Sequence, residues 1–222
     1  MSVTLEVVVE IEPREHVRPA PTASGAEDPE GWRAWWQDCL MARGFPRLEP
    51  VPGEWLVELA TLDDQSLLRV LDDQNDDWRS TPVDASEVTP LAGGLALRVG
   101  GEWKVMPRCC GDLSNLSDWR GALAQPEFEW RMLWVGHPWR LARRTGDSLE
   151  LSPPTEADEF VGAPDLVISC AALSRAVALA QPQLEALARR LEPLLLAHGQ
   201  PVENARTLAR QFAGVADLPL TG

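Results

Sequence analysis

Alternating apolar and polar residues predict β-strands in three parts of the chain. Residues 3–11 and 54–62 each carry apolar side chains at every second position, which is the spacing of a strand with one buried face. Residues 127–134 show the same alternation, so we expect one side of that strand to lie in the core. The side chains predicted to face the core there are Phe128, Trp130, Met132 and Trp134.

Two further apolar segments, residues 95–106 and 139–151, are predicted to form β-hairpins. A three-residue loop in each hairpin keeps the apolar side chains of both strands on one face, whereas a two-residue turn puts polar residues opposite them. We therefore expect the second hairpin to pair Leu141 with Leu151. The predicted loops are residues 100–102 and 145–147.

The clearest predicted helix runs from residue 29 to residue 44 and is rich in tryptophan. Asp28 can cap its first turn, Pro29 suits the first helical position, and Gly44 ends it. Ser117 can cap a second, short helix that runs to about residue 125. Residues 67–71 are compatible with either a helical turn or a strand. The apolar face of the first helix is predicted to hold Trp32, Trp35, Trp36, Cys39 and Leu40, with Arg33, Gln37 and Asp38 pointing away.

The C-terminal part of the chain is rich in Ala and Leu at helical spacing. Pro182, Pro193 and Pro201 each remove a backbone donor, which predicts several short helices or a kinked one. We predict an α+β protein with a mainly antiparallel sheet built from hairpins, an N-terminal Trp-rich helix and a helical C-terminal region. The predicted domains are an α+β body over residues 1–160 and a helical region over residues 161–222 that packs on it.

The composition is strongly acidic. Asp and Glu number 34 against 20 Lys and Arg, which gives a formal net charge of −14. Such a surface repels phosphate backbones and anionic membranes and attracts basic partners. We therefore expect a basic protein partner, and neither nucleic-acid nor membrane binding. The alternative is that the charge only keeps the protein soluble.

The sequence also indicates a compartment. Its first residues carry acids within an apolar run, unlike a secretory signal, and no apolar stretch reaches the roughly 18 residues of a membrane span. The 4 cysteines are too few and too irregularly spaced for a disulfide framework. We expect a cytoplasmic protein, and the residue bias is typical of a GC-rich bacterial gene.

The segment Pro-Arg-Cys-Cys-Gly-Asp-Leu over residues 107–113 carries the most distinctive candidate chemistry. A thiolate beside a base can act as a nucleophile, and thiolates, carboxylates and imidazoles bind metals. The candidates are Cys109, Cys110, Asp112 and His137. Adjacent residues of an extended segment point to opposite faces, however, so the two thiols are poorly placed to hold one ion. We favour structural packing with one thiol buried, and we predict no metal, no cofactor and no catalytic residue.

Asp112 and His137 also have structural interpretations. Asp112 follows a glycine and is expected to bond backbone amides in a turn. His137 precedes a proline at the junction of two predicted strands, where it is either a turn residue or a functional group held by a rigid scaffold.

Acidic residues gather in the middle of the chain, around residues 63–77. They are Asp63, Asp64, Asp72, Asp73, Asp76 and Asp77. Trp78 follows directly, and an indole within an acid-rich loop is typical of an edge that binds a basic protein. The alternative, which the sequence leaves open, is that Trp78 packs back onto the core.

Residues 107–139 resemble little-characterised bacterial proteins associated with polymorphic-toxin immunity. The resemblance is carried by Cys-Cys-Gly-Asp-Leu, by Trp119 and by Leu-Trp-Val-Gly-His-Pro-Trp. Together with the charge, it implies an immunity-type protein, not an enzyme, that neutralises a cognate toxin by covering a basic site with the acids before Trp78. The alternatives are a metal- or thiol-dependent enzyme that uses the cysteine segment, and a scaffold or adaptor protein of a bacterial secretion or defence system.

Overall fold

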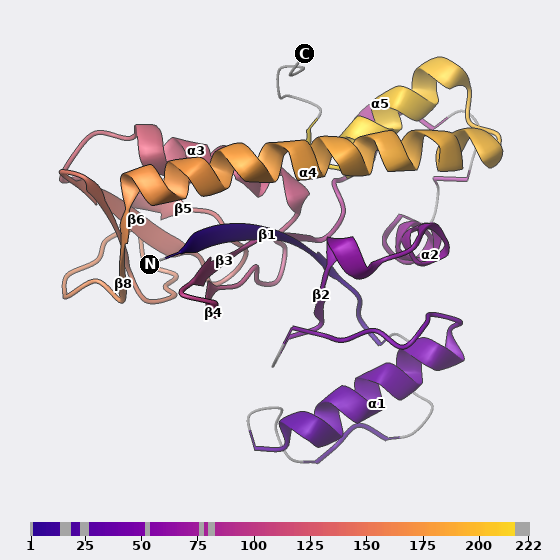
Figure 1. The fold of residues 1–222 in the computed structure, drawn as a ribbon, viewed down its shortest axis with the longest axis horizontal. Helices are drawn as coiled ribbons and strands as arrows, with labels where there is room; N and C mark the ends of the chain where they lie inside the picture. The colour runs from indigo at the N-terminus through magenta and orange to yellow at the C-terminus, as the bar shows by residue number, and fades with distance from the viewer. Residues whose placement is uncertain are drawn as a thin grey trace.

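The computed structural model describes residues 2–13, 19–22, 27–51, 54–75, 78–79 and 83–215. Over these residues the chain forms two four-stranded sheets, each with antiparallel pairing, and helices pack around them (Figure 1). The predicted α+β class, with antiparallel sheets and a helical C-terminal region, is confirmed.

The first sheet has the strand order β2-β1-β3-β4, with β1 at its centre. One face of β1 places Leu5, Val7 and Val9 in the main core, as its alternation predicts. Val8, on the opposite face, packs in a second small cluster. The bounds are Val3–Glu10 for β1, Leu56–Glu58 for β2, Gly93–Val99 for β3 and Glu102–Val105 for β4. The predicted strand over residues 54–62 is thus shorter than expected, because the chain enters a 3-10 turn, Leu59–Thr61.

The second sheet has the order β5-β6-β7-β8. Its last strand lies beyond residue 160, so the sheet extends across the predicted division between body and C-terminal region. The bounds are Arg131–Leu133 for β5, Arg140–Thr145 for β6, Ser148–Leu151 for β7 and Leu166–Ser169 for β8.

The predicted buried face of residues 127–134 is wrong. Leu133 and Val135 lie in the core, whereas Phe128 is 69% exposed and Met132 is 48% exposed. Two causes act together: Phe128 has a φ of +67°, which interrupts extended backbone, and pairing to β6 places Leu133 on the same face as Ala142.

Both predicted hairpin loops are also wrong, because each turn has two residues. Val99 pairs with Glu102 across Gly100 and Gly101, and Thr145 pairs with Ser148. Both glycines have positive φ, which suits a tight hairpin turn. A register shift between Leu97 and Arg98, of the kind that a β-bulge produces, then pairs Val105 with Leu97. In the second hairpin, Leu151 pairs with Ala142 in place of Leu141.

The N-terminal helices follow their sequence signals closely. In α1 (Pro29–Ala42), Asp28 accepts a hydrogen bond from the backbone N–H of Gly31 at 2.9 Å, as predicted. Gln37, expected to point away, is instead buried and donates to the Leu48 carbonyl at 2.7 Å. The ambiguous apolar segment belongs to the helix α2 (Asp64–Gln74). The helix α3 (Leu116–Ala124) lies where the second helix was predicted, but Ser117 is inside its first turn and Asn115 occupies the cap position.

The C-terminal region contains α4 (Cys170–Ala197) and α5 (Val202–Phe212). The predicted alternative of several short helices is wrong at Pro182 and Pro193, which lie inside one 28-residue helix, whereas Pro201 does lie between α4 and α5. Each interior proline costs about 3 kcal/mol, and burial of the leucine stripe on both sides offsets this cost. Figure 1 shows α4 running over β1, with α1 on the other side of the molecule. Among the described helices, none is both long enough and apolar enough to cross a membrane.

Candidate functional site

The turn over residues 107–112 joins the two sheets. The backbone N–H of Arg108 donates to the Val135 carbonyl at 2.7 Å, and the N–H of His137 donates to the Cys109 carbonyl at 2.8 Å. On the other side, the N–H of Gly93 at the start of β3 donates to the Gly111 carbonyl at 3.0 Å. The turn therefore bonds both to the first sheet and to the connection between β5 and β6.

The two cysteines of this turn lie side by side at the surface. Cys109 and Cys110 are both exposed, and their Sγ atoms are 3.4 Å apart. The expectation of one buried thiol on the opposite face is wrong, because Cys110 has a φ of +65° and the segment is not extended. Within the described part of the chain, no group of three or more His, Cys, Asp or Glu side chains is placed to hold a metal ion.

Asp112 and His137 flank the cysteines with different partners. Asp112 accepts a hydrogen bond from the backbone N–H of Ser114 at 2.8 Å, which confirms its predicted role in the turn. The structure brings His137 to Cys109 through the backbone, while the imidazole stacks on Trp139 with ring centres 5.2 Å apart. Its Nε2 atom lies 3.7 Å from Oε1 of Glu156.

The electrostatic surroundings of Cys109 disfavour a thiolate. A hydrogen bond with Cys110, the negative charge that Cys110 can acquire, and the more distant Glu10 and Glu12 all raise the pKa of the Cys109 thiol. Burial raises the pKa of Glu10 itself, and the neighbouring carboxylates of Glu12 and Glu54 raise it further. A raised thiol pKa is the opposite of what a cysteine nucleophile requires.

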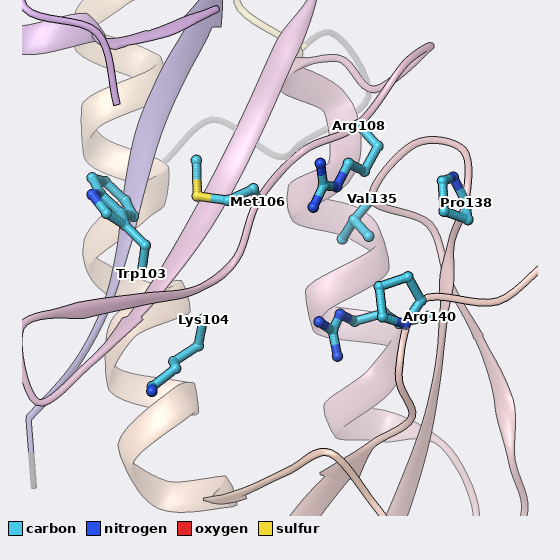
Figure 2. A pocket seen from close by; sticks show the side chains of 8 residues that line it. Trp103, Lys104, Met106, Arg108, Val135, Pro138 and Arg140 are labelled. Atoms are coloured by element: carbon cyan, nitrogen blue, oxygen red, sulfur yellow. The ribbon is translucent and has the colours of Figure 1, made fainter. Parts of the chain in front are cut away.

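A pocket of about 190 Å³ opens beside the turn, between β4 and the connection from β5 to β6. Figure 2 shows the guanidinium groups of Arg108 and Arg140 pointing into this space. Both cations already have anionic partners in the chain: Arg108 bonds Glu54 at 2.7 Å and Arg140 bonds Asp165 at 2.8 Å. The positive charges of these two arginines are therefore neutralised by carboxylates of the same chain.

The acids predicted to bind a partner have roles within the fold where the structure describes them. Asp63 caps α2 by accepting the Ser66 N–H at 2.7 Å, and its pKa is lowered chiefly by its hydrogen bonds with Ser66. The ion pairs are Asp64 with Arg190, Asp72 with Arg79, and Asp73 with Arg43. Asp76 and Asp77 lie outside the described residues.

Trp78 is fully buried, so the interpretation of its indole as an exposed binding edge is wrong. Its Nε1 donates to Oδ1 of Asp72 at 2.8 Å, and Arg79 lies over the ring at 4.4 Å. Burial raises the pKa of Asp72, but hydrogen bonds from Arg79 and Trp78 outweigh it and the net shift is downward. Trp78 anchors the acid-rich segment to the core, which is the alternative that the sequence left open.

Asp118, which sequence reasoning did not single out, is a half-buried carboxyl on α3 with a strongly shifted pKa. Burial, and then the nearby charge of Asp112, raise its pKa to about 6. It lines an open pocket of about 350 Å³ together with Arg131 and Met132. No local sequence signal marks Asp118, because its burial depends on how α3 packs against β5.

A second acid-rich segment, residues 156–161, was also missed. Glu156, Asp158 and Glu159 are exposed, and Val161 after them is 97% exposed. Phe160 anchors the segment by an edge-to-face contact with Trp130, with ring centres 5.1 Å apart. The sequence signal that could have identified this segment is a run of acidic and apolar residues between Pro154 and Pro164.

In comparisons with family models, curated proteins and solved structures, none matches this chain with two antiparallel sheets.

Proposed function

We propose that the chain is an immunity-type protein that binds a basic bacterial toxin and neutralises it. The observation that carries the proposal is the surface segment 156–161, where three exposed carboxyl side chains precede an almost fully exposed valine. Carboxylates attract a basic partner and set its orientation, while an apolar contact beside them supplies burial.

The proposed contact surface differs from the one that the sequence favoured. Asp64, Asp72 and Asp73 already pair with arginines, so a partner's cations would compete with internal ones. In the 156–161 segment, by contrast, Glu156 only approaches His137, with Oε1 and Nε2 3.7 Å apart. Met132, on the edge strand β5, and Phe128, just before that strand, are also exposed, and in the sequence they lie on either side of Trp130, which contacts Phe160.

The test uses two full-length variants with equal changes of charge. One carries Glu156→Gln, Asp158→Asn and Glu159→Gln. Its matched control carries Glu30→Gln, Glu87→Gln and Glu203→Gln, which are exposed acids on other elements. Each variant is immobilised and used to capture proteins from a lysate of the cells that naturally produce the chain. Capture is compared at low and moderate salt, because salt screens exposed ion pairs at an interface and weakens them.

Support requires a basic partner that the wild type and the control retain, that the 156–159 variant loses, and whose toxicity in cells is relieved by coexpression of the wild type. Equal capture by both variants would contradict the proposed surface. Unchanged toxicity on coexpression would contradict neutralisation.

A further inference from the structure

The two exposed thiols at the sheet junction are placed to form a bond with each other. Their Sγ atoms are 3.4 Å apart, and the left-handed backbone at Cys110 turns both side chains toward the same region. A disulfide bond is about 2.05 Å long, so a small rotation of the side chains and a local change of the turn would close it. Both sulfur atoms are also open to a soluble reagent.

The other two cysteines differ in their surroundings. Cys39 is fully buried in α1, and Cys170 is partly buried at the start of α4. Among the described residues, the close contact between sulfur atoms is that of Cys109 with Cys110. An oxidant in solution is therefore expected to react first with Cys109 and Cys110, whose thiols are accessible and adjacent to each other.

Adjacent cysteines make an unusual disulfide. Neighbouring Cα atoms are about 3.8 Å apart across a trans peptide, whereas the Cα atoms of ordinary disulfides are about 4.4–6.8 Å apart. A bond between Cys109 and Cys110 must therefore distort the small ring that contains their shared peptide. Strained and exposed disulfides are the easily reduced kind, which form and break in response to the surrounding thiol pool.

We propose that Cys109 and Cys110 form a reversible dithiol–disulfide site whose oxidant is a small disulfide of the glutathione class. One cysteine thiolate attacks a sulfur atom of oxidised glutathione, which forms a mixed disulfide and releases one glutathione thiolate. The neighbouring thiol loses its proton to solvent and attacks the protein sulfur, which releases the second glutathione. Two electrons pass to glutathione, and the protein loses two hydrogen atoms.

Formation of the disulfide would change the backbone hydrogen bonds at the junction of the two sheets. The Cys109 carbonyl accepts the His137 N–H at 2.8 Å, and the Arg108 carbonyl accepts the Gly111 N–H at 2.8 Å. Distortion of the peptide between the cysteines reorients the first carbonyl and weakens its hydrogen bond. The site thus couples a chemical change in two surface sulfur atoms to the connection between β5 and β6.

The first experiment tests the pairing of the thiols without oxidation. Phenylarsine oxide binds two close thiols through one arsenic atom, with loss of one water. We expect one arsenic per native chain, none in Cys109→Ser or Cys110→Ser, and an unchanged single equivalent in the control Cys170→Ser. Binding that persists in either single variant, or that is lost in the control, would overturn the pairing.

The second experiment tests reversible oxidation. The native chain is incubated with mixtures of oxidised and reduced glutathione, blocked, and digested after arginine, which yields the peptide of residues 109–120. We expect this peptide to lose two hydrogen atoms when oxidised glutathione is in excess and to regain them in reduced glutathione. Cys109→Ser should instead trap one glutathione on Cys110. Stable mixed disulfides on the wild type, links to Cys170, or no reaction would each overturn the proposal.

Discussion

The backbone of Gly136 passes against the carbonyl group of Arg108. A Cβ atom on Gly136 would lie 2.3 Å from that carbonyl oxygen, and the glycine has a φ of +96°. The two backbone segments come this close because the N–H of Arg108 donates a hydrogen bond to the Val135 carbonyl at 2.7 Å. Both the space and the backbone conformation at this crossing therefore require glycine.

Gly136→Ala should lower the free energy of unfolding by about 3 kcal/mol, since the new methyl group meets rigid backbone in a conformation that alanine disfavours. Gly146→Ala is the control: its φ is +57°, but no atom lies within 4 Å of the added Cβ. The control should lose only about 1 kcal/mol. Urea unfolding of both variants measures the difference, and equal losses would show that the contact with Arg108 is not tight.

Trp78→Ala should be strongly destabilising, by about 3–5 kcal/mol, because it empties a fully buried site. Trp78→Phe keeps most of the apolar volume and removes the hydrogen bond from Nε1 to Asp72, so it should cost less, about 1–3 kcal/mol. Chemical denaturation measures both. A cost near zero for the alanine variant would mean that Trp78 is at the surface in solution.

Asp118 should make stability depend on pH in an unusual direction. Its pKa in the folded state is about 6, above the ordinary value of 3.8, so the native protein holds this proton more tightly than the unfolded chain. The contribution is therefore fully present below about pH 4 and is lost as pH rises through 6. Because the carboxyl is only partly buried, we expect a loss of about 1–2 kcal/mol.

The variant Asp118→Asn isolates this contribution. Relative to wild type it should gain stability as pH rises from 4 to 7, because the amide acquires no charge. Asp158→Asn, an exposed acid, should leave the pH dependence of wild type unchanged. Parallel pH profiles for wild type and Asp118→Asn would contradict the raised pKa.

Arg140 should stabilise the second sheet far more than an exposed arginine does. Its side chain is 10% exposed and donates to the Ser152 carbonyl at 2.6 Å and to Asp165. Arg140→Ala leaves a buried carbonyl without its donor and should cost about 2–4 kcal/mol. Arg131→Ala, which removes an exposed pair with Glu129, should cost at most about 0.5 kcal/mol. Thermal unfolding compares the two.

Elements with local signals could be predicted from the sequence. Asp28 and Pro29 mark the start of α1, and the alternation from Val3 predicts the central strand β1 and its buried face. In these elements the residues that define the structure are neighbours in the sequence. Local propensity and hydrophobic period therefore agree with the final packing.

Strand register could not be predicted in the same way. The bulge after Leu97 changes the phase of one strand, and periodicity alone assumes that the phase is constant. The aromatic residues Phe128 and Trp130 suggested a buried face, but pairing of β5 with β6 placed Leu133 in the core instead. These outcomes depend on partners distant in the sequence.

The candidate site was only partly visible in the sequence. The Cys109–Cys110 pair was identified, but its exposure depends on the left-handed conformation of Cys110, which residues rarely adopt unless they are glycine, asparagine or aspartate. Trp78 was equally compatible with a surface and a core position, because the Gln200 side chain that bonds its carbonyl lies far along the chain.

The continuity of α4 has a consequence for the cooperativity of unfolding. A helix of 28 residues is about 42 Å long, and this one packs on β1 of one sheet while continuing directly from β8 of the other. It also packs against α3, which contacts β5 and β6 of the second sheet, so loss of α4 uncovers the first sheet and removes the support of the helix on the second. Melting, proteolytic nicking within α4 or truncation before it should therefore disrupt both halves in a single cooperative step.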